Sequence, residues 1–181
     1  MSLAEGERLA RLFKAVGAGD LAAVQAAVVD GASVRAQDDD GREPLHLACF
    51  KGHLDIAQWL HSAGASLDAT DSDAGWTPLH FACYSGHLEV AQWLCSAGAD
   101  ATLKTNEGYT PAQLLQRPAL TVQLDQQALR STLACLVRRV QAQGLLPCTV
   151  ALGEALPLTP LCLAQVQRHR MLRQRPPPHP A

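Results

Sequence analysis

The stretch Glu43-Pro-Leu-His-Leu-Ala-Cys-Phe-Lys-Gly-His-Leu-Asp-Ile-Ala-Gln-Trp-Leu60 recurs with few changes as Thr77-Pro-Leu-His-Phe-Ala-Cys-Tyr-Ser-Gly-His-Leu-Glu-Val-Ala-Gln-Trp-Leu94, which begins 34 residues later. Self-similarity at a fixed period of this size is typical of stacked copies of one supersecondary unit. Each copy contacts only its neighbours in such an array. The repeat therefore predicts a solenoid.

Residues at the ends of the second copy have the properties that helix termini require. The Thr77 hydroxyl can cap a helix that starts at Pro78, where a missing N–H does no harm. Gly86 ends this helix, and Gly98 supplies the left-handed residue that ends a second one. Glu43 occupies the position of Thr77 in the first copy and is a poorer cap. Two short helices per repeat are predicted.

The Thr-Pro-Leu-His sequence at 77–80, the Gly-His pair at 86–87 and the Ala-Gly-Ala sequence at 97–99 together resemble the ankyrin repeat. This resemblance implies a β-turn followed by two antiparallel helices in each unit, and hence an all-α ankyrin-repeat solenoid with hairpin tips. It also implies that the protein holds another protein, which is the usual work of the family.

The repeat pattern also divides the chain. We expect a degenerate N-terminal capping repeat at 1–36, ankyrin repeats at 37–70 and 71–104, a partial repeat with a capping helix at 105–143, and a poorly ordered tail, rich in proline and leucine and then basic, at 144–181. Apolar residues at helical intervals place the capping helix at about 123–142. The turn that starts at Asp71 has one residue more than its counterparts. Trp59, Trp93 and Phe81 are expected in the core.

Composition and cysteine spacing indicate the cellular compartment in which the protein is expected. The chain has 181 residues, of which 48% are hydrophobic, and a net charge of −2. No uncharged apolar run reaches the ~18 residues of a membrane span, and Glu5 and Glu7 stand where a signal peptide would be basic. Cys49 and Cys83 take equivalent places in successive repeats, too far apart for a disulfide. We expect a monomer with reduced thiols, in the cytoplasm or nucleus and away from membranes.

The charges are unevenly distributed. Residues 1–100 have 14 acidic and 6 basic side chains, whereas residues 101–181 have 3 acidic and 9 basic ones. An acidic folded body repels phosphates, so we expect no nucleic-acid partner. The asymmetry favours a protein partner of basic or mixed charge.

Histidine and cysteine recur at zinc-like spacing in both copies, at His46, Cys49 and His53 and at His80, Cys83 and His87. Each lies at a repeat position, however, so we expect the histidines to bond backbone groups in the turns and the cysteines to act as small hydrophobes. Asp38-Asp39-Asp40 before Gly41 is typical of a tight turn. We therefore expect no metal, no cofactor and no enzymatic activity.

In the ankyrin family, partners commonly bind the hairpin tips and the exposed side of the first helices, which line the concave face. By alignment this surface comprises Asp39, Asp40, Arg42, Phe50, Lys51, Asp73, Ala74, Trp76, Tyr84, Ser85, Asn106, Glu107 and Tyr109. Four of these thirteen are aromatic in a chain with 4% aromatics, and aromatic anchors are typical of binding hot spots. The leading hypothesis is an adaptor that binds a peptide or protein segment there.

An alternative uses the C-terminal region. The helical segment from Ser131 to Arg139, followed by Leu156-Pro-Leu-Thr-Pro-Leu161, resembles a SOCS box, although Thr159 replaces a proline. This resemblance implies a substrate adaptor of a ubiquitin ligase.

Overall fold

A computed structural model of the chain describes residues 3–115 and 126–142. The helices in these ranges are α1 (Leu3–Ala18), α2 (Leu21–Val29), α3 (Pro44–Lys51), α4 (Leu54–Ser62), α5 (Pro78–Ser85), α6 (Leu88–Ala97), α7 (Pro111–Leu115) and α9 (Gln126–Ala142). No residue in the two ranges belongs to a β-strand, so the described part is all-α as predicted. None of the described helices is both long and apolar enough to cross a bilayer.

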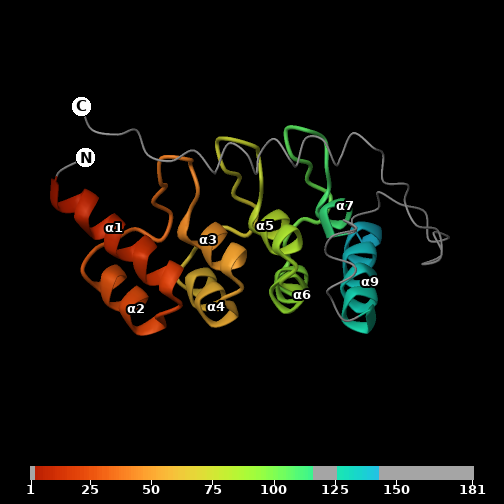
Figure 1. Cartoon of the computed structure of the whole chain (residues 1–181), viewed down its shortest axis with the longest axis horizontal. Helices are drawn as coiled ribbons and strands as arrows, with labels where there is room; N and C mark the ends of the chain where they lie inside the picture. The colour runs from red at the N-terminus through yellow and green to blue at the C-terminus, as the bar shows by residue number, and fades with distance from the viewer. Residues whose placement is uncertain (1–2, 116–125, 143–181) are drawn as a thin grey trace, which may run out of the picture. The chain divides into compact units, whose positions relative to one another are not determined.

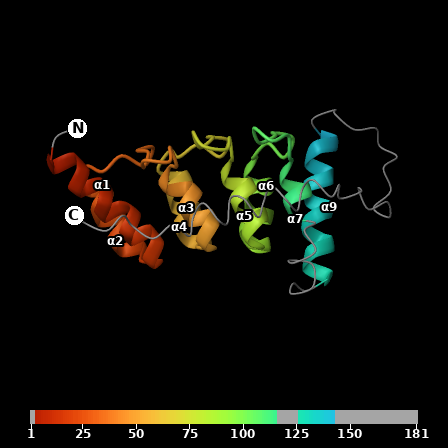
Figure 2. The same cartoon turned by 45° about the horizontal axis from the view of Figure 1, so that its top comes forward.

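The helices form two rows (Figures 1 and 2). The inner row consists of α1, α3, α5 and α7, each packed against the next, and the outer row of α2, α4, α6 and α9. Within a repeat the two helices also contact each other, as α3 and α4 do. The segments that join successive repeats project beside the inner row and appear at the top of Figure 1. We call three of them the tips, at residues 38–42, 71–76 and 105–109.

The helix ends follow the sequence prediction. The backbone N–H of His80 donates to Thr77 Oγ1 at 3.4 Å, and Pro78 is the first residue of α5. Gly86 and Gly98 terminate α5 and α6 with φ angles of 77° and 112°. These contacts satisfy backbone groups that a helix end leaves unpaired.

Leucines at repeat positions form the centre of the core, and Leu45 and Leu79 are fully buried. Phe81 is 2% exposed, which confirms its predicted place. The prediction for Trp59 and Trp93 was wrong, because both are only half-buried against the core. They lie on α4 and α6, and an indole ring is too large to be enclosed where a leucine would fit.

The predicted capping helix is present as α9. Leu129 and Leu136, two helical turns apart, are 5% and 1% exposed and belong to the same core as the repeats. Positions 123–125 of the predicted helix and the whole of 144–181, with the Leu-Pro sequence of the SOCS-like alternative, lie outside the described residues.

Candidate protein-binding site

Each tip is closed in the same way. The backbone N–H of its first residue donates to the carbonyl of its last, at 3.0 Å in all three pairs: Asp38 to Arg42, Asp71 to Trp76, and Thr105 to Tyr109. A side-chain oxygen of the first residue accepts the N–H of the last, at 2.9, 2.7 and 3.2 Å. The middle tip has the extra residue that was predicted. Sequence reasoning missed the closing role of Asp38 and Asp71, although the recurrence of an accepting side chain at this position was visible.

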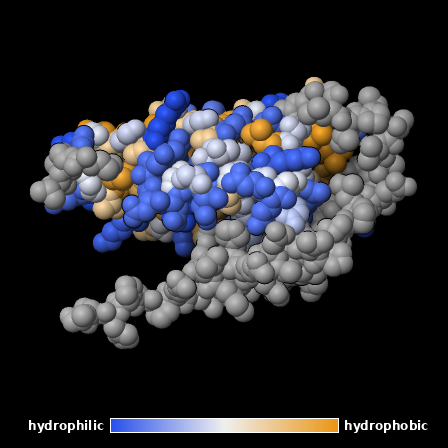
Figure 3. Space-filling model, turned by 90° about the horizontal axis from the view of Figure 1, so that it is seen from above, coloured by the Kyte–Doolittle hydropathy of each residue, from blue (hydrophilic) through white to orange (hydrophobic). Residues whose placement is uncertain are grey.

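Hydrogen bonds also join neighbouring tips. Ser72 donates to the Asp40 carbonyl from its backbone nitrogen at 3.3 Å and from its hydroxyl at 3.1 Å. Asn106 donates to the carbonyls of Ala74 and Asp73, at 2.9 Å from its backbone and 3.4 Å from its side chain. Figure 3 views the array from the side of the tips, where hydrophilic residues cover most of the coloured surface. The tips thus form one connected polar row.

Arg42 neutralises part of the acidic first tip. Its guanidinium donates to Asp38 Oδ2 at 2.7 and 2.9 Å and lies 2.8 Å from Asp40 Oδ2. Burial opposes the charge of Arg42, but the hydrogen bond to Asp38 and the nearby carboxylates outweigh it, so the pKa of Arg42 is raised. The carboxylates of Asp39 and Asp73 lie at exposed positions in the row.

An aromatic cluster adjoins the tips. The Trp76 ring lies 4.9 Å from Tyr84 and 5.1 Å from Phe81, between ring centroids, and Phe50 lies 6.1 Å from Phe81. Buried Phe81 therefore links Phe50 of one repeat to Trp76 of the next, and Tyr84 joins the cluster through Trp76. Lys51 lies over the Phe50 ring, with Nζ 5.7 Å from its centroid.

The predicted surface is less exposed than expected. Its exposed members are Asp39, Asp40, Lys51, Asp73, Asn106 and Glu107; the half-buried ones are Arg42, Phe50, Trp76, Tyr84, Ser85 and Tyr109; and Ala74 is buried. The Ser85 hydroxyl oxygen is enclosed and has no hydrogen-bond partner. Full exposure was the wrong expectation for these seven residues, because successive repeats stack closely enough for large side chains to cover one another.

His46 and His80 bond to backbone groups, as predicted. His46 Nδ1 accepts from the Glu43 N–H at 2.9 Å, and His46 Nε2 lies 2.8 Å from the Ala69 carbonyl, to which it donates. His80 makes the same pair of contacts with Thr77 and Tyr109, at 3.2 and 3.1 Å. Burial lowers the pKa of His80 to about 4 and also lowers that of His46. Both rings are therefore neutral near pH 7. Each one connects its repeat to the next through the hydrogen bond from Nε2.

The cysteines at the repeat positions are enclosed. Cys49 and Cys83 have no exposed surface, and burial raises the pKa of both thiols. Across residues 3–115 and 126–142, no three His, Cys, Asp or Glu side chains converge as metal ligands would.

Glu43 is the main departure from the repeat template. Its side chain is 7% exposed, and Oε2 is buried without a hydrogen-bond partner. Burial raises its pKa, and the positive charge of Arg35 offsets this only in part. Because its pKa is higher in the folded state, Glu43 lowers the stability of the fold only when its carboxyl is ionised. This loss of stability is absent at low pH, grows as the pH rises through the folded-state pKa, and persists above it.

We expect Glu43→Thr to stabilise the protein at neutral pH by at least about 1 kcal/mol, the usual contribution of a threonine cap. Near pH 4, where glutamate in the unfolded chain titrates, the difference in stability between the variant and wild type should fall to the contribution of the threonine cap alone. Urea unfolding of both proteins at the two pH values measures this difference. The reciprocal control, Thr77→Glu, should destabilise the next repeat. An equal gain for Glu43→Thr at both pH values would contradict the burial of an ionised carboxylate.

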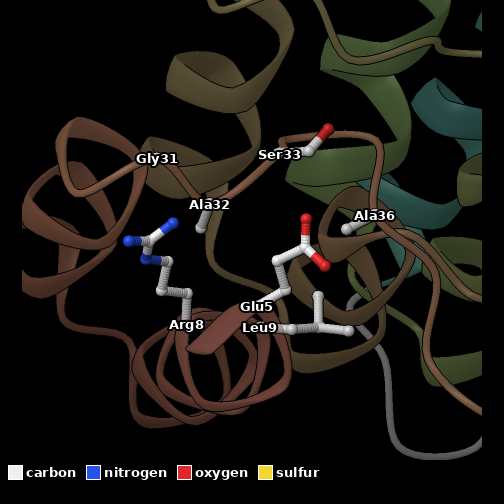
Figure 4. Close-up of a pocket in the computed structure, with 7 residues that line it drawn as sticks. All are labelled: Glu5, Arg8, Leu9, Gly31, Ala32, Ser33 and Ala36. Carbon is white, nitrogen blue, oxygen red and sulfur yellow. The ribbon is translucent and has the colours of Figure 1, made fainter. Parts of the chain in front are cut away.

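Two pockets with largely apolar linings lie in the N-terminal repeat, away from the tips. One, of about 190 Å³, is lined from α1 by Glu5, Arg8 and Leu9 and from the segment after α2 by Gly31, Ala32, Ser33 and Ala36. Figure 4 shows the Glu5 and Arg8 side chains, of opposite charge, both extending from α1 toward the segment after α2. The other, of about 380 Å³, lies between α1 and α2 and is lined largely by alanines. Neither pocket brings together groups typical of catalysis.

Comparison with known families agrees with this architecture. A family model described as ankyrin repeats, in three copies, matches residues 12–105. The chain belongs to the ankyrin-repeat family.

Among curated proteins, the chain is similar to protein phosphatase 1 regulatory subunit 27 from human and from mouse. The identities are 46% and 45% over 65 residues, which are 36% of this chain and 42% of each relative. The chain thus matches less than half the length of these relatives. Ankyrin repeats together with a regulatory-subunit relative support a role in protein interaction.

Proposed function

We propose that the protein is an adaptor that binds a peptide or protein segment on its tip face, which we define as the three tips and the adjoining exposed side of α3, α5 and α7. The observation that carries the proposal is the aromatic cluster. Trp76, Tyr84 and Phe50 are half-exposed; buried Phe81 contacts Trp76 and Phe50, and Trp76 contacts Tyr84. Rigid aromatic anchors of this kind lose little conformational entropy on binding and are typical of hot spots.

Charge favours a basic or mixed partner. The exposed carboxylates of Asp39 and Asp73 belong to the tips beside the aromatic rings, whereas Asp40 is already paired with Arg42. Lys51, over the face of Phe50, adds a positive charge at the same surface. A partner with lysine or arginine opposite the aspartates and an acidic group opposite Lys51 fits this pattern.

The name of the relatives suggests the first partner to test, the catalytic subunit of protein phosphatase 1. A pull-down from cell lysate with the full chain tests other partners without prior choice. Each protein recovered is then titrated against purified variants, so that affinity is measured directly.

Trp76→Ala is expected to lower the affinity for the partner by about 2 kcal/mol, a loss of roughly 30-fold. The matched control is Trp59→Ala, which removes another half-buried tryptophan, from α4 of the outer row. Both variants should lose roughly 2 kcal/mol of stability, because half of a large side chain is buried in each. Only Trp76→Ala should lose affinity.

A charge test separates the tips from the outer row. Asp39→Lys and Asp73→Lys should weaken a basic partner, more at low salt than at high salt. Glu89→Lys, at an exposed position on α6, should leave binding unchanged. If Trp59→Ala and Glu89→Lys weaken every recovered partner while the tip variants bind normally, the outer row is the binding surface and the proposal fails.

A further inference from the structure

Two polar contacts set the register between α6 and α9. The Gln92 side-chain amide donates to Thr132 Oγ1 at 2.8 Å. At the other end, the Arg139 guanidinium donates to the Gly98 carbonyl at 2.6 Å and to the Ala99 carbonyl at 3.3 Å. Positions about 40 residues apart therefore face each other along both helices, which run in the same direction.

Cys95 and Cys135 occupy facing positions between these two contacts. Cys95 follows Gln92 by three residues, and Cys135 follows Thr132 by three. The polar contacts on both sides fix the positions of α6 and α9 relative to each other, and each thiol lies within the electrostatic reach of the other. The register therefore places the two sulfur atoms at the same level of the two helices.

Exposure distinguishes Cys135 from the other cysteines that the structure describes. Cys49 and Cys83 have no exposed surface, and Cys95 is 4% exposed. Cys135 is half-buried, so a small reagent can reach it. A reaction at Cys135 would place the reacting sulfur beside Cys95.

We propose that Cys95 and Cys135 form a reversible disulfide when the protein meets a low-molecular-weight disulfide such as oxidised glutathione. The Cys135 thiol loses its proton and its thiolate attacks one sulfur of the reagent, which releases one small thiol and leaves a mixed disulfide. The Cys95 sulfur then attacks Cys135 Sγ, loses its own proton and releases the second small thiol. Two protein thiols are oxidised, and the reagent is reduced to two thiols.

The surroundings of the two sulfurs agree with this order of attack. Burial, followed by the charge of Cys135, raises the pKa of Cys95 to about 12. Cys95 is therefore protonated in the resting protein, so Cys135 rather than Cys95 is the sulfur that attacks the reagent first. The positive charge of Arg139 stabilises the Cys95 thiolate as it forms.

The link would tie the C-terminal capping helix covalently to the last full repeat. Leu129 and Leu136 already bury one side of α9 in the core. A disulfide that closes the loop from 95 to 135 restricts the unfolded chain further. Oxidation should therefore raise the melting temperature of the array by several degrees.

The test treats the reduced full chain with oxidised glutathione, blocks the remaining thiols, and maps peptides by mass spectrometry. Cleavage after Lys, Arg and Glu places each of the six cysteines on a different peptide, with Cys95 on 90–104 and Cys135 on 131–138. The expected product links these two peptides, and dithiothreitol should reverse both the link and the rise in melting temperature.

Cys135→Ser should abolish both the disulfide-linked peptide and the increase in melting temperature on oxidation. The control Cys49→Ser should still form the disulfide between Cys95 and Cys135. If a serine variant does not fold, the peptide map of the oxidised wild-type protein still shows whether Cys95 and Cys135 are joined. Recovery of Cys135 only as a glutathione adduct, or joined to a different cysteine, overturns the proposal. So does a linked protein that melts at a lower temperature than the reduced one.

Discussion

Replacing Phe81 with alanine is expected to lower the free energy of unfolding by roughly 3 to 5 kcal/mol. The ring is 2% exposed and lies at the junction of two repeats. Its centroid is 5.6 Å from His46, 6.1 Å from Phe50 and 5.1 Å from Trp76. Removing it leaves a cavity and takes away edge contacts that each contribute about 0.5 to 1.5 kcal/mol. Partner affinity should fall as well, because Trp76 loses its support.

Urea unfolding, followed by circular dichroism, measures the loss of stability. The comparison requires that the free energy of unfolding falls with urea concentration at the same slope in both proteins. Phe50→Ala is the matched control, because the same side chain is removed from a half-buried position on α3. We expect it to cost roughly 2 kcal/mol. Equal losses for the two variants would mean that Phe81 is not the centre of the cluster.

Gly41→Ala is expected to cost about 3 kcal/mol. Gly41 has a φ of 73°, which costs a residue with a Cβ roughly 1 to 2 kcal/mol. An added Cβ would also lie 2.8 Å from the Ser72 backbone nitrogen. Ser72 would have to move away from the Asp40 carbonyl, and its two hydrogen bonds there contribute about 1 kcal/mol each. The first and second tips should then separate.

Gly108→Ala isolates the contact between tips. Gly108 has a φ of 86° at the third tip, but a Cβ there would meet no atom within 4 Å. Its cost should be the backbone cost alone, roughly 1 to 2 kcal/mol. Thermal unfolding of both variants gives the difference. A Gly41→Ala variant no less stable than Gly108→Ala would show that the bonds between the first two tips contribute little.

Local features were predictable from the sequence because they depend on residues close together in the chain. The caps at Thr77 and Gly86, the longer turn after Asp71, and the helix that became α9 all follow from short-range patterns. The backbone contacts of His46 and His80 were predictable for a different reason. Each histidine recurs at the same template position, so one local geometry serves both repeats.

Side-chain exposure was predicted poorly. Phe50, Trp76 and Tyr84 were expected in solvent, yet each packs against the core. Trp59 and Trp93 were expected inside, yet both are half-exposed. The exposure of a large ring depends on the side chains that the next repeat or the other row places beside it, and the repeat register does not specify these.

By itself the sequence determined the ankyrin architecture, the helix ends and the turns, because a period of about 34 residues and the preferences of proline, glycine and threonine act locally. Only the tertiary structure decided which distant groups meet. It buried Glu43 without a partner for Oε2, packed Phe81 of one repeat against Phe50 of the repeat before it, and set Cys95 beside Cys135. These contacts depend on how stacked repeats and the capping helix pack in three dimensions, to which spacing along the chain is only a weak guide.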